Sequence, residues 1–280
     1  MYIRCWGSRG SVPVSGNQFA RHGGDTTCLE IRPKSGETII VDAGTGIRRL
    51  GRRLVEEGRN RYHLIFTHAH LDHIMGFPFF RPLFTRSARF RMYRPPLSAF
   101  VGPMLSNIMI PPFFPIRYRD VPAHIEFARE TDGLDRFEIG SVTIEPIPLS
   151  HPNTGRGFKF TEDGRCFVFL TDNELQYDHP DRVPYREYVA FAAEADLLVH
   201  DAEYTPAEYP AVISYGHSTY IQALELALKA GVKKLGLFHL NQDRSDQAMT
   251  EILDHCHTLI NENGRPLECF AVRSDMEFEL

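Results

Sequence analysis

Four side chains that can bind a metal stand within six consecutive residues, directly behind a short apolar run. The segment "HLIFTHAHLDH" (63–73) contains His68, His70, Asp72 and His73. In an extended chain, residues two apart face the same side, so His68 and His70 point together, and Asp72 and His73 follow in the turn. Imidazole and carboxylate are ligands of zinc, manganese and iron. A single tetrahedral zinc does not use all four, so the cluster indicates two adjacent ions.

Three further metal-binding residues stand where other apolar runs end. His151 ends "IEPIPLSH", Asp172 ends "CFVFLTD", and His239 lies near the end of "KLGLFHL". Strand ends at one edge of a layered sheet converge on a common cleft, so these residues are expected beside the 68–73 cluster. Asp172 is the natural bridge between two ions, because a carboxylate has two oxygens. The competing interpretation, hydrogen-bonded histidines and a solvated turn, gives no reason for Asp72 or for the three partners.

Apolar runs bounded by turn residues predict strands and two long helices. The strands are expected at 27–33, 38–44, 62–68, 141–151, 166–172, 196–201, 234–240 and 268–272. The helices are expected within 217–232, from an N-cap at Ser218 to a stop at Gly231, and within 245–264, from Ser245 to Gly264. No low-complexity linker divides the sequence, so the pattern predicts one layered α/β domain covering 1–280.

The segment 77–140 departs from this pattern. "FPFFRPLF", "RMYRPP" and "IMIPPFFPIRY" are rich in proline and aromatic residues, and a core strand does not tolerate so many prolines. We expect this aromatic and proline-rich insertion to be irregular and to cover the cleft, in the manner of a lid.

Charge and cysteine content argue against several classes of protein. Five cysteines without a CxxC pair indicate neither a disulfide framework nor a cysteine zinc site. The net charge of −5 argues against binding of long nucleic acid, and the basic run at 46–61 fits a solvated helix face. The N-terminus lacks the form of a signal peptide, and no apolar run approaches the roughly 18 residues of a membrane span. We therefore expect a soluble, cytoplasmic protein that does not bind membranes.

The motif "THAHLDH" (67–73) resembles the HxHxDH signature of the metallo-β-lactamase superfamily, and later candidate ligands follow in that family's order. "IIVDAGTG" (39–46), with Asp42, resembles the upstream motif that supports the metal loop. The resemblance implies the metallo-β-lactamase fold, an αββα four-layer sandwich with a dinuclear site at one edge. It assigns His68, His70 and His151 to the first metal, Asp72, His73 and His239 to the second, and Asp172 to both.

A second pair of motifs narrows the resemblance. "LLVHDAEY" (197–204) and "GHST" (216–219) resemble paired motifs of the ribonuclease Z-like phosphodiesterase branch. This implies that His217, held by Asp201, meets the scissile phosphate. A carboxylate partner orients the ring and favours its cationic form, which suits protonation of a leaving alkoxide. Ser218 and Thr219, with the first amides of the following helix, would bind a phosphate oxygen. The alternative is that Asp201 and His217 only cap or pin loops.

The sequence also departs from ribonuclease Z. Those enzymes carry a long arm that grips transfer RNA between the third metal histidine and the bridging aspartate, whereas here only a hairpin's length separates His151 from Asp172. With the acidic balance, this argues against transfer RNA as a substrate. The start, "RCWGSRGSVPVSG", looks more like bacterial members described as cyclic-nucleotide phosphodiesterase-like or as metal-dependent hydrolases.

The expected function is metal-dependent hydrolysis of a small phosphodiester, with a cyclic nucleotide as one option. Two divalent ions, zinc by expectation and manganese or iron as alternatives, would supply hydroxide from water. Asp72 or Asp172 would orient that hydroxide, and His217 with Asp201 would assist the leaving oxygen. The alternatives are an ester, thioester or lactone hydrolase at the same centre, and a non-catalytic metal-dependent sensor. The sequence leaves open the natural substrate, the metal, the oligomeric state, with a homodimer as one option, and the roles of His22, Asp25 and His200.

Overall fold

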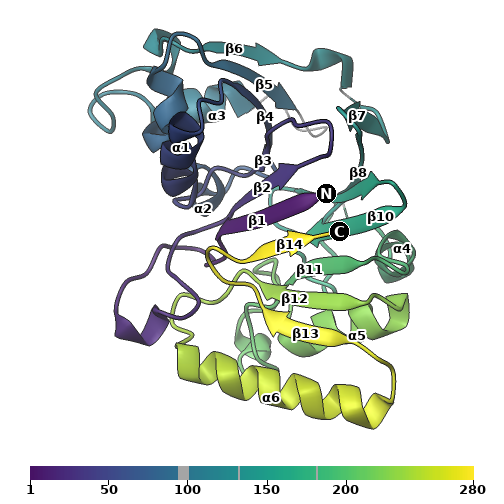
Figure 1. The fold of residues 1–280 in the computed structure, drawn as a ribbon. Coiled ribbons are helices and arrows are strands. Elements are labelled where there is room, and N and C mark those ends of the chain that lie inside the picture. The colour runs from purple at the N-terminus through teal and green to yellow at the C-terminus, as the bar shows by residue number, and fades with distance from the viewer. Residues whose placement is uncertain (94–100, 132, 181) are drawn as a thin grey trace.

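Two β-sheets lie face to face, and helices cover both outer faces (Figure 1). The structure is a computed structural model that describes residues 1–93, 101–131, 133–180 and 182–280. The expected αββα sandwich is confirmed. None of the described helices combines the length and the apolar composition that a membrane span requires.

The first sheet has the strand order β14-β1-β2-β3-β4-β5-β6. Its strands are β1 (Tyr2–Gly7), β2 (Cys28–Arg32), β3 (Ile39–Val41), β4 (Arg61–Ile65), β5 (Arg89–Tyr93), β6 (His124–Phe127) and β14 (Glu277–Glu279). Pairing is antiparallel from β14 to β3 and parallel from β3 to β6. The helices that follow its strands are α1 (Ile47–Glu56), α2 (Leu71–Ile74) and α3 (Val101–Ile108).

The second sheet has the strand order β13-β12-β11-β10-β9-β8-β7. Its strands are β7 (Phe137–Ile139), β8 (Val142–Pro148), β9 (Arg156–Glu162), β10 (Arg165–Leu170), β11 (Leu197–Asp201), β12 (Lys234–Phe238) and β13 (Glu268–Ala271). Its helices are α4 (Tyr185–Phe191), α5 (Tyr220–Ala230) and α6 (Asp246–Asn263). Short 3₁₀ helices lie at Asn17–Phe19, Phe77–Phe79, Arg81–Phe84, Tyr118–Asp120, Arg129–Thr131 and Tyr209–Ala211.

Three apolar layers hold the four structural layers together. Between the sheets, buried aromatic side chains such as Phe160, Phe167 and Phe238 meet the aliphatic residues of β1 to β3. A second layer packs α1 and the 3₁₀ helices on the first sheet, and a third packs α4, α5 and α6 on the second. In α1, Leu50 and Leu54 are buried while the exposed arginines face solvent. This is the solvated helix face that the basic run at 46–61 predicted.

The predicted strands are all present, within a few residues at each end. The helix α6 begins and ends as expected, because the Ser245 side chain accepts a hydrogen bond from the amide of Ala248 and Gly264 adopts a left-handed conformation. The predicted N-cap of α5 was wrong by one residue. Thr219, not Ser218, caps this helix in a reciprocal capping box with Gln222.

The segment 77–140 is more regular than expected. It contains α3 and the strands β5, β6 and β7, and β5 and β6 extend the first sheet. The prolines that argued against strands lie outside these three strands, so they do not interrupt the sheets, and the expectation of an irregular segment was wrong at β5, β6 and β7. Residues 94–100 and 132 of this segment lie outside the described residues. Coverage of the cleft by 77–140 stays a prediction.

Candidate metal centre

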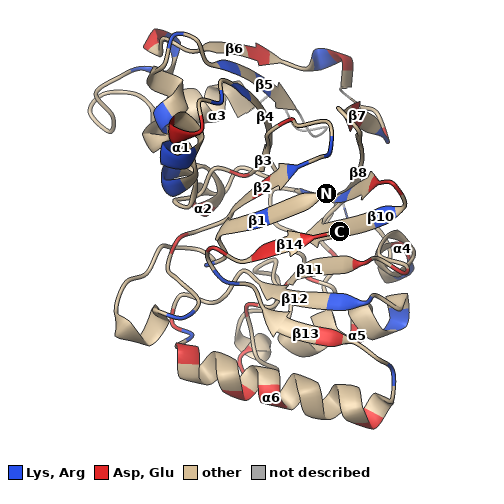
Figure 2. Ribbon diagram, viewed as in Figure 1, with Lys and Arg blue, Asp and Glu red and all other residues tan. Residues whose placement is uncertain are grey.

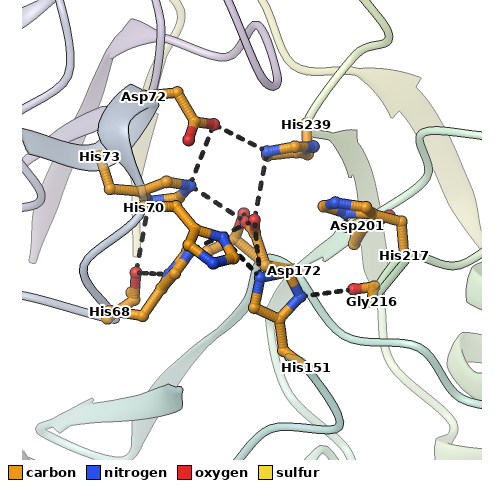
Figure 3. Close-up of polar contacts among 12 residues, drawn as sticks. His68, His70, Asp72, His73, His151, Asp172, Asp201, Gly216, His217 and His239 are labelled. Atoms are coloured by element: carbon orange, nitrogen blue, oxygen red, sulfur yellow. Dashed lines mark hydrogen bonds and ion pairs between the residues drawn. The ribbon is translucent and has the colours of Figure 1, made fainter. Parts of the chain in front are cut away.

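The seven predicted metal ligands meet at one edge of the sandwich. They form two groups that share Asp172, and in each group the potential ligand atoms lie within 4.8 Å of one another. Figure 3 shows the side chains pointing toward a common centre. The first group holds His68, His70, His151 and Asp172, and the second holds Asp72, His73, Asp172 and His239. This is the division that the resemblance implied.

Left-handed backbone places three of the site residues. Asp42, Asp172 and His239 follow the ends of β3, β10 and β12 and have φ values of 62°, 51° and 55°. Such a conformation is uncommon for residues other than glycine and is strained by about 1 kcal/mol or more. It turns the chain sharply where the strand ends, so these side chains lie at the sheet edge. Backbone strain of this kind is concentrated at functional sites.

In the first group, imidazole nitrogens lie close together, and one buried nitrogen lacks a hydrogen-bond partner among the described residues. Nε2 of His151 lies 2.9 Å from Nδ1 of His70, and Nε2 of His68 lies 3.5 Å from Oδ2 of Asp172. The Nε2 atom of His68 is buried and has no hydrogen-bond partner among the described residues. The other nitrogen of His151, Nδ1, donates to the carbonyl of Gly216 at 2.8 Å, which leaves Nε2 as its ligand atom.

In the second group, carboxylates and imidazoles alternate around a point. Nε2 of His239 lies 3.1 Å from Oδ2 of Asp72 and 3.3 Å from Oδ2 of Asp172. Nε2 of His73 lies 3.2 Å from Oδ1 of Asp172, and it too lacks a hydrogen-bond partner in the described part of the chain. The backbone amide of Ser11 donates to Oδ2 of Asp72 at 3.0 Å and so orients this carboxylate.

The spacing and the donor set fit metal ions. Two ligands that each lie about 2.1 Å from a tetrahedral zinc are about 3.3–3.4 Å apart, and the separations in the second group lie between 3.1 and 3.4 Å. Imidazole nitrogen and carboxylate oxygen are the donors that zinc, manganese and iron accept. The orphaned Nε2 atoms of His68 and His73 are the groups that an ion would satisfy. The site is therefore suited to two metal ions.

Buried partners fix the rings of the second group. Oδ2 of Asp42 accepts from Nδ1 of His73 at 2.8 Å, and Asp42 also accepts from the amide and the hydroxyl of Thr67. Oε2 of Glu203 accepts from Nδ1 of His239 at 3.0 Å. A ring nitrogen that donates to a carboxylate leaves the opposite nitrogen, Nε2, free to bind metal. The expected support of the metal loop by Asp42 is present.

Electrostatics at the site favour positive charge. Burial lowers the pKa of His68 well below its usual value and that of His151 to about 3, so these rings are neutral, as metal ligands must be. Burial also acts to lower the pKa of His73 and His239, but the buried carboxylates, Asp172 first, raise it well above its usual value. A pocket that stabilises cationic imidazoles in this way attracts metal cations.

Next to the second group, His217 is held by two carboxylates. Its Nδ1 donates to Oδ2 of Asp201 at 2.6 Å and lies 3.3 Å from Oε2 of Glu203. The ring stacks on His239, with centroids 4.6 Å apart and planes 17° apart. Burial acts to lower the pKa of His217, but the charges of Glu203 and Asp201 raise it to about 9. The expected pairing of His217 with Asp201 is present, and Glu203 is a second partner.

Sequence reasoning missed Glu203. This buried residue touches both His217 and His239, and its Oε1 accepts from Asn241. The signal was available in "HDAEY", because Asp201 and Glu203 are two residues apart at the end of β11, where an extended chain points them the same way. Glu203 could therefore have been predicted as a site residue together with Asp201.

The hydroxyls of Ser218 and Thr219, which were expected to bind a phosphate oxygen, have other partners. Ser218 Oγ donates to the carbonyl of Asn173 at 2.5 Å and accepts from the amide of Leu175. Thr219 Oγ1 accepts from the amide of Gln222 as the cap of α5. Both residues are buried. These contacts give both hydroxyls structural roles, and the expected contact with a phosphate oxygen stays a prediction.

The three residues whose roles the sequence left open, His22, Asp25 and His200, form hydrogen bonds outside the two metal-ligand groups. His22 Nδ1 lies 2.9 Å from Asp246, Asp25 accepts from the hydroxyl of Thr45 at 3.0 Å, and His200 Nδ1 donates to the carbonyl of residue 201 at 2.7 Å. The first two contacts attach the N-terminal loop to α6 and to the turn before α1. His200 is fully buried behind the site.

Two glycines allow the backbone to approach the metal ligands. A Cβ atom at Gly216, whose φ is +94°, would lie 2.1 Å from Nδ1 of His151. A Cβ atom at Gly10 would lie 2.3 Å from Nδ1 of His239. Both distances are shorter than any real contact, so a side chain at Gly10 or Gly216 would collide with the neighbouring ligand ring.

Comparison with known proteins agrees with this geometry. The family model described as Beta-lactamase superfamily domain matches residues 37–240, which include all seven ligands. Ribonuclease BN of Proteus mirabilis (strain HI4320) is 34% identical over 108 residues, which are 38% of this chain and 32% of that protein. The chain therefore aligns with about a third of the length of this curated relative.

Solved structures show the same fold over the whole chain. The metallo-beta-lactamase fold protein YhfI from Bacillus subtilis has a TM-score of 0.70 and 16% identity, covering 100% of this chain and 99% of that one. A diphosphatase from the PhnP family has a TM-score of 0.68 and 18% identity, covering 100% and 97%. From the match over residues 37–240 and the shared fold, the chain belongs to the beta-lactamase superfamily and has the metallo-β-lactamase fold of its metal-dependent hydrolases.

Proposed function

We propose that this protein is a metal-dependent phosphodiesterase that hydrolyses a small phosphodiester. The observation that carries the proposal is His217, which stacks on the metal ligand His239 while Asp201 and Glu203 hold its Nδ1. Hydrolysis of an ester, thioester or lactone needs the metal ligands but gives the cationic side chain of His217 no role in the reaction. Two similar proteins, one named a ribonuclease and the other a diphosphatase, support action on phosphate esters or anhydrides.

Two sets of residues would hold the ions. His68, His70, His151 and Asp172 would bind one ion, and Asp72, His73, Asp172 and His239 the other. Two divalent ions supply Lewis acidity at a phosphoryl oxygen and lower the pKa of water enough to give a nucleophile near neutral pH. Zinc is our expectation, and manganese and iron suit the same donors.

The chain's own side chains orient the reacting groups. Asp72 accepts the amide of Ser11 on Oδ2, so its other oxygen, Oδ1, is the one left to accept a proton from the attacking water. Because Nδ1 of His217 donates to Asp201, the proton that His217 gives to the leaving oxygen comes from Nε2. Asp201 itself is fixed by the backbone amides of Glu203 and Ser218, each at 3.1 Å.

A small substrate suits the surroundings of the site. Between the ligands His151 and Asp172, the chain forms only the hairpin of β9 and β10, which has no room for an arm that holds a folded RNA. The net charge of −5 also disfavours a long polyanion. Small phosphodiesters, cyclic nucleotides among them, are the substrate class that we propose.

Chelation followed by metal add-back tests the proposal. We expect the purified protein to hydrolyse bis(p-nitrophenyl) phosphate, to lose this activity when a chelator removes its metal, and to regain it with zinc or manganese. Parallel assays with thioester and lactone substrates separate the phosphodiesterase from the other hydrolases. Activity that survives complete metal removal, or a thioester turned over far faster than any phosphodiester, would contradict the proposal.

A further inference from the structure

A row of basic side chains lies at the end of the first sheet that is remote from the metal centre. Arg61, Arg89 and His124 are the first residues of β4, β5 and β6, and the register of these parallel strands pairs Arg61 with Arg89 and Arg89 with His124. Neighbouring strands are about 4.8 Å apart, so the three side chains stand next to one another on one face. We call these three residues the cationic row.

The cationic row stands on the inner face of the sheet, beyond the reach of the second sheet. Arg61 and Arg89 share a face with Ile65 and Tyr93, which pack in the core between the sheets. Where the second sheet ends, that face is open, and Arg61, Arg89 and His124 are exposed. Figure 2 shows basic residues on and next to β5, at the edge of the molecule away from β10 to β13.

The two arginines of the row lack acidic partners. Among the described residues, neither Arg61 nor Arg89 forms an ion pair, whereas Arg91 on the same face pairs with Glu130 and His124 contacts Glu126. Like charges directly opposite one another on neighbouring strands destabilise a sheet. Glu126 lies near Arg89 without a direct ion pair, so, within the described ranges, the two guanidinium groups keep their donors free. A pair of such groups at this spacing is a binding arrangement for an oxyanion, because each guanidinium presents a fork of donors.

A cavity accompanies the cationic row. It has a volume of about 400 Å³, and all three residues of the row line it together with His63, Arg91 and one carboxylate, that of Glu126. A second cavity of about 310 Å³ shares Arg61 and His63 with the first and continues past Arg59. Binding sites for small molecules have volumes of this order. The row therefore borders a space of the size that a small ligand needs.

Protection of the sheet edge does not account for the row. Charges that face inward on an edge strand prevent pairing with another chain, and this applies to His124 and Glu126 on the edge strand β6. Arg61 lies on β4, two strands from that edge. The row is also separate from the metal centre, because the four residue steps from Arg61 to Ile65 span about 13 Å along β4 before the metal loop begins.

We propose that the cationic row is a second binding site, for a small anion that carries a diphosphate group. Two guanidinium groups at strand spacing match two adjacent phosphoryl groups, and the cavity accommodates the rest of a small ligand. This inference is independent of the reaction proposed for the metal centre.

Calorimetric titration of the metal-loaded protein with inorganic pyrophosphate tests the site. The double substitution Arg61→Gln/Arg89→Gln should weaken the binding at least tenfold, since hydrogen bonds to charged groups are among the strongest in proteins. The matched control is Arg48→Gln/Arg52→Gln on the exposed face of α1, which changes the net charge equally and should leave the affinity within about twofold. Metal content is measured after each titration, so that removal of metal by pyrophosphate is not counted as binding.

Three results would overturn the proposal. They are no pyrophosphate binding beyond what the double variant retains, equal loss in the control variant, and tight binding of a single-stranded oligoribonucleotide through Arg61 and Arg89 without binding of pyrophosphate. The Arg61→Lys/Arg89→Lys variant guards against a folding defect, because it keeps both charges and should recover part of the affinity. Hydrolysis of bis(p-nitrophenyl) phosphate should be unchanged in all these variants.

Discussion

The two metal-ligand groups differ in the hydrogen-bond partners of their histidine rings. In the second group, the ring of His73 donates to Asp42 and the ring of His239 donates to Glu203, both of them buried carboxylates. In the first group, the ring of His151 donates to a backbone carbonyl, and Nδ1 of His68 lies 3.1 Å from the hydroxyl of Thr67. Behind the ring of His70, the described residues place the amide of Asn153 at 3.5 Å. One group is therefore supported by negative charge and the other by neutral dipoles.

This difference predicts different metal affinities. A carboxylate behind an imidazole raises the basicity of the ligand nitrogen and fixes its orientation, and loss of such a partner weakens metal binding about 10–100-fold. The second group also contributes Asp72 in addition to the shared Asp172. We expect its ion to bind more tightly, and the ion of the first group to exchange more readily.

The largest effect should come from the residue that both groups share. The substitution Asp172→Ala removes a ligand from each group, so we expect loss of both ions and a decrease in kcat/KM on the order of 10⁴-fold or more, because both Lewis acidity and the nucleophile depend on the metals. Elemental analysis and the phosphodiester assay measure the two effects. Asp178→Ala, which removes an exposed aspartate paired with Arg182, is the control. If the variant still bound two ions per chain, Asp172 could not be a ligand that both groups share.

Removal of His217 should separate metal binding from turnover. His217→Ala leaves every ligand in place, so we expect unchanged metal content and a decrease in kcat of about 10²–10⁴-fold, as for loss of a general acid. His255→Ala is the matched control, because this exposed histidine lies on α6 outside the metal groups, where its ring contacts that of Tyr220 and its Nδ1 the hydroxyl. A variant that loses the ion of the second group instead would make His217 a support for His239 rather than a catalytic residue.

The carboxylate support itself can be weakened without changing a ligand. In Asp42→Asn, an amide cannot accept from His73 and from Thr67 as the carboxylate does, so we expect the affinity for the ion of the second group to decrease about 10–100-fold. Titration with a metal indicator should show a much smaller change at the first group, which Asp42 reaches through the hydroxyl of Thr67 beside His68. If the affinities for both ions decreased equally, carboxylate support would not distinguish the second group from the first.

The sequence predicted the centre better than its surroundings. The meeting of the seven candidate ligands was predictable because each stands in a dense motif or at the end of an apolar run, and strand ends meet at a sheet edge. Glu203 was missed although "HDAEY" places it two residues after Asp201, and its contact with His239 depends on the distance between the ends of β11 and β12, which no local pattern encodes. The strands β5 and β6 were missed although "RFRMY" and "HIEF" alternate polar and apolar residues, because the prolines around these short runs were taken as evidence against strands.

The smallest effect should come from the outermost support of the first group. Asn153 is exposed, and its amide lies 3.5 Å from Nε2 of His70, a long contact between neutral groups in solvent. Such a contact contributes little, so Asn153→Ala should change the affinity for the ion of the first group by less than about threefold. The same indicator titration measures this effect beside that of Asp42→Asn. A change of tenfold or more at Asn153 would mean that neutral, exposed contacts hold a ligand ring as firmly as buried carboxylates, and the expected difference between the two ions would then have no physical basis.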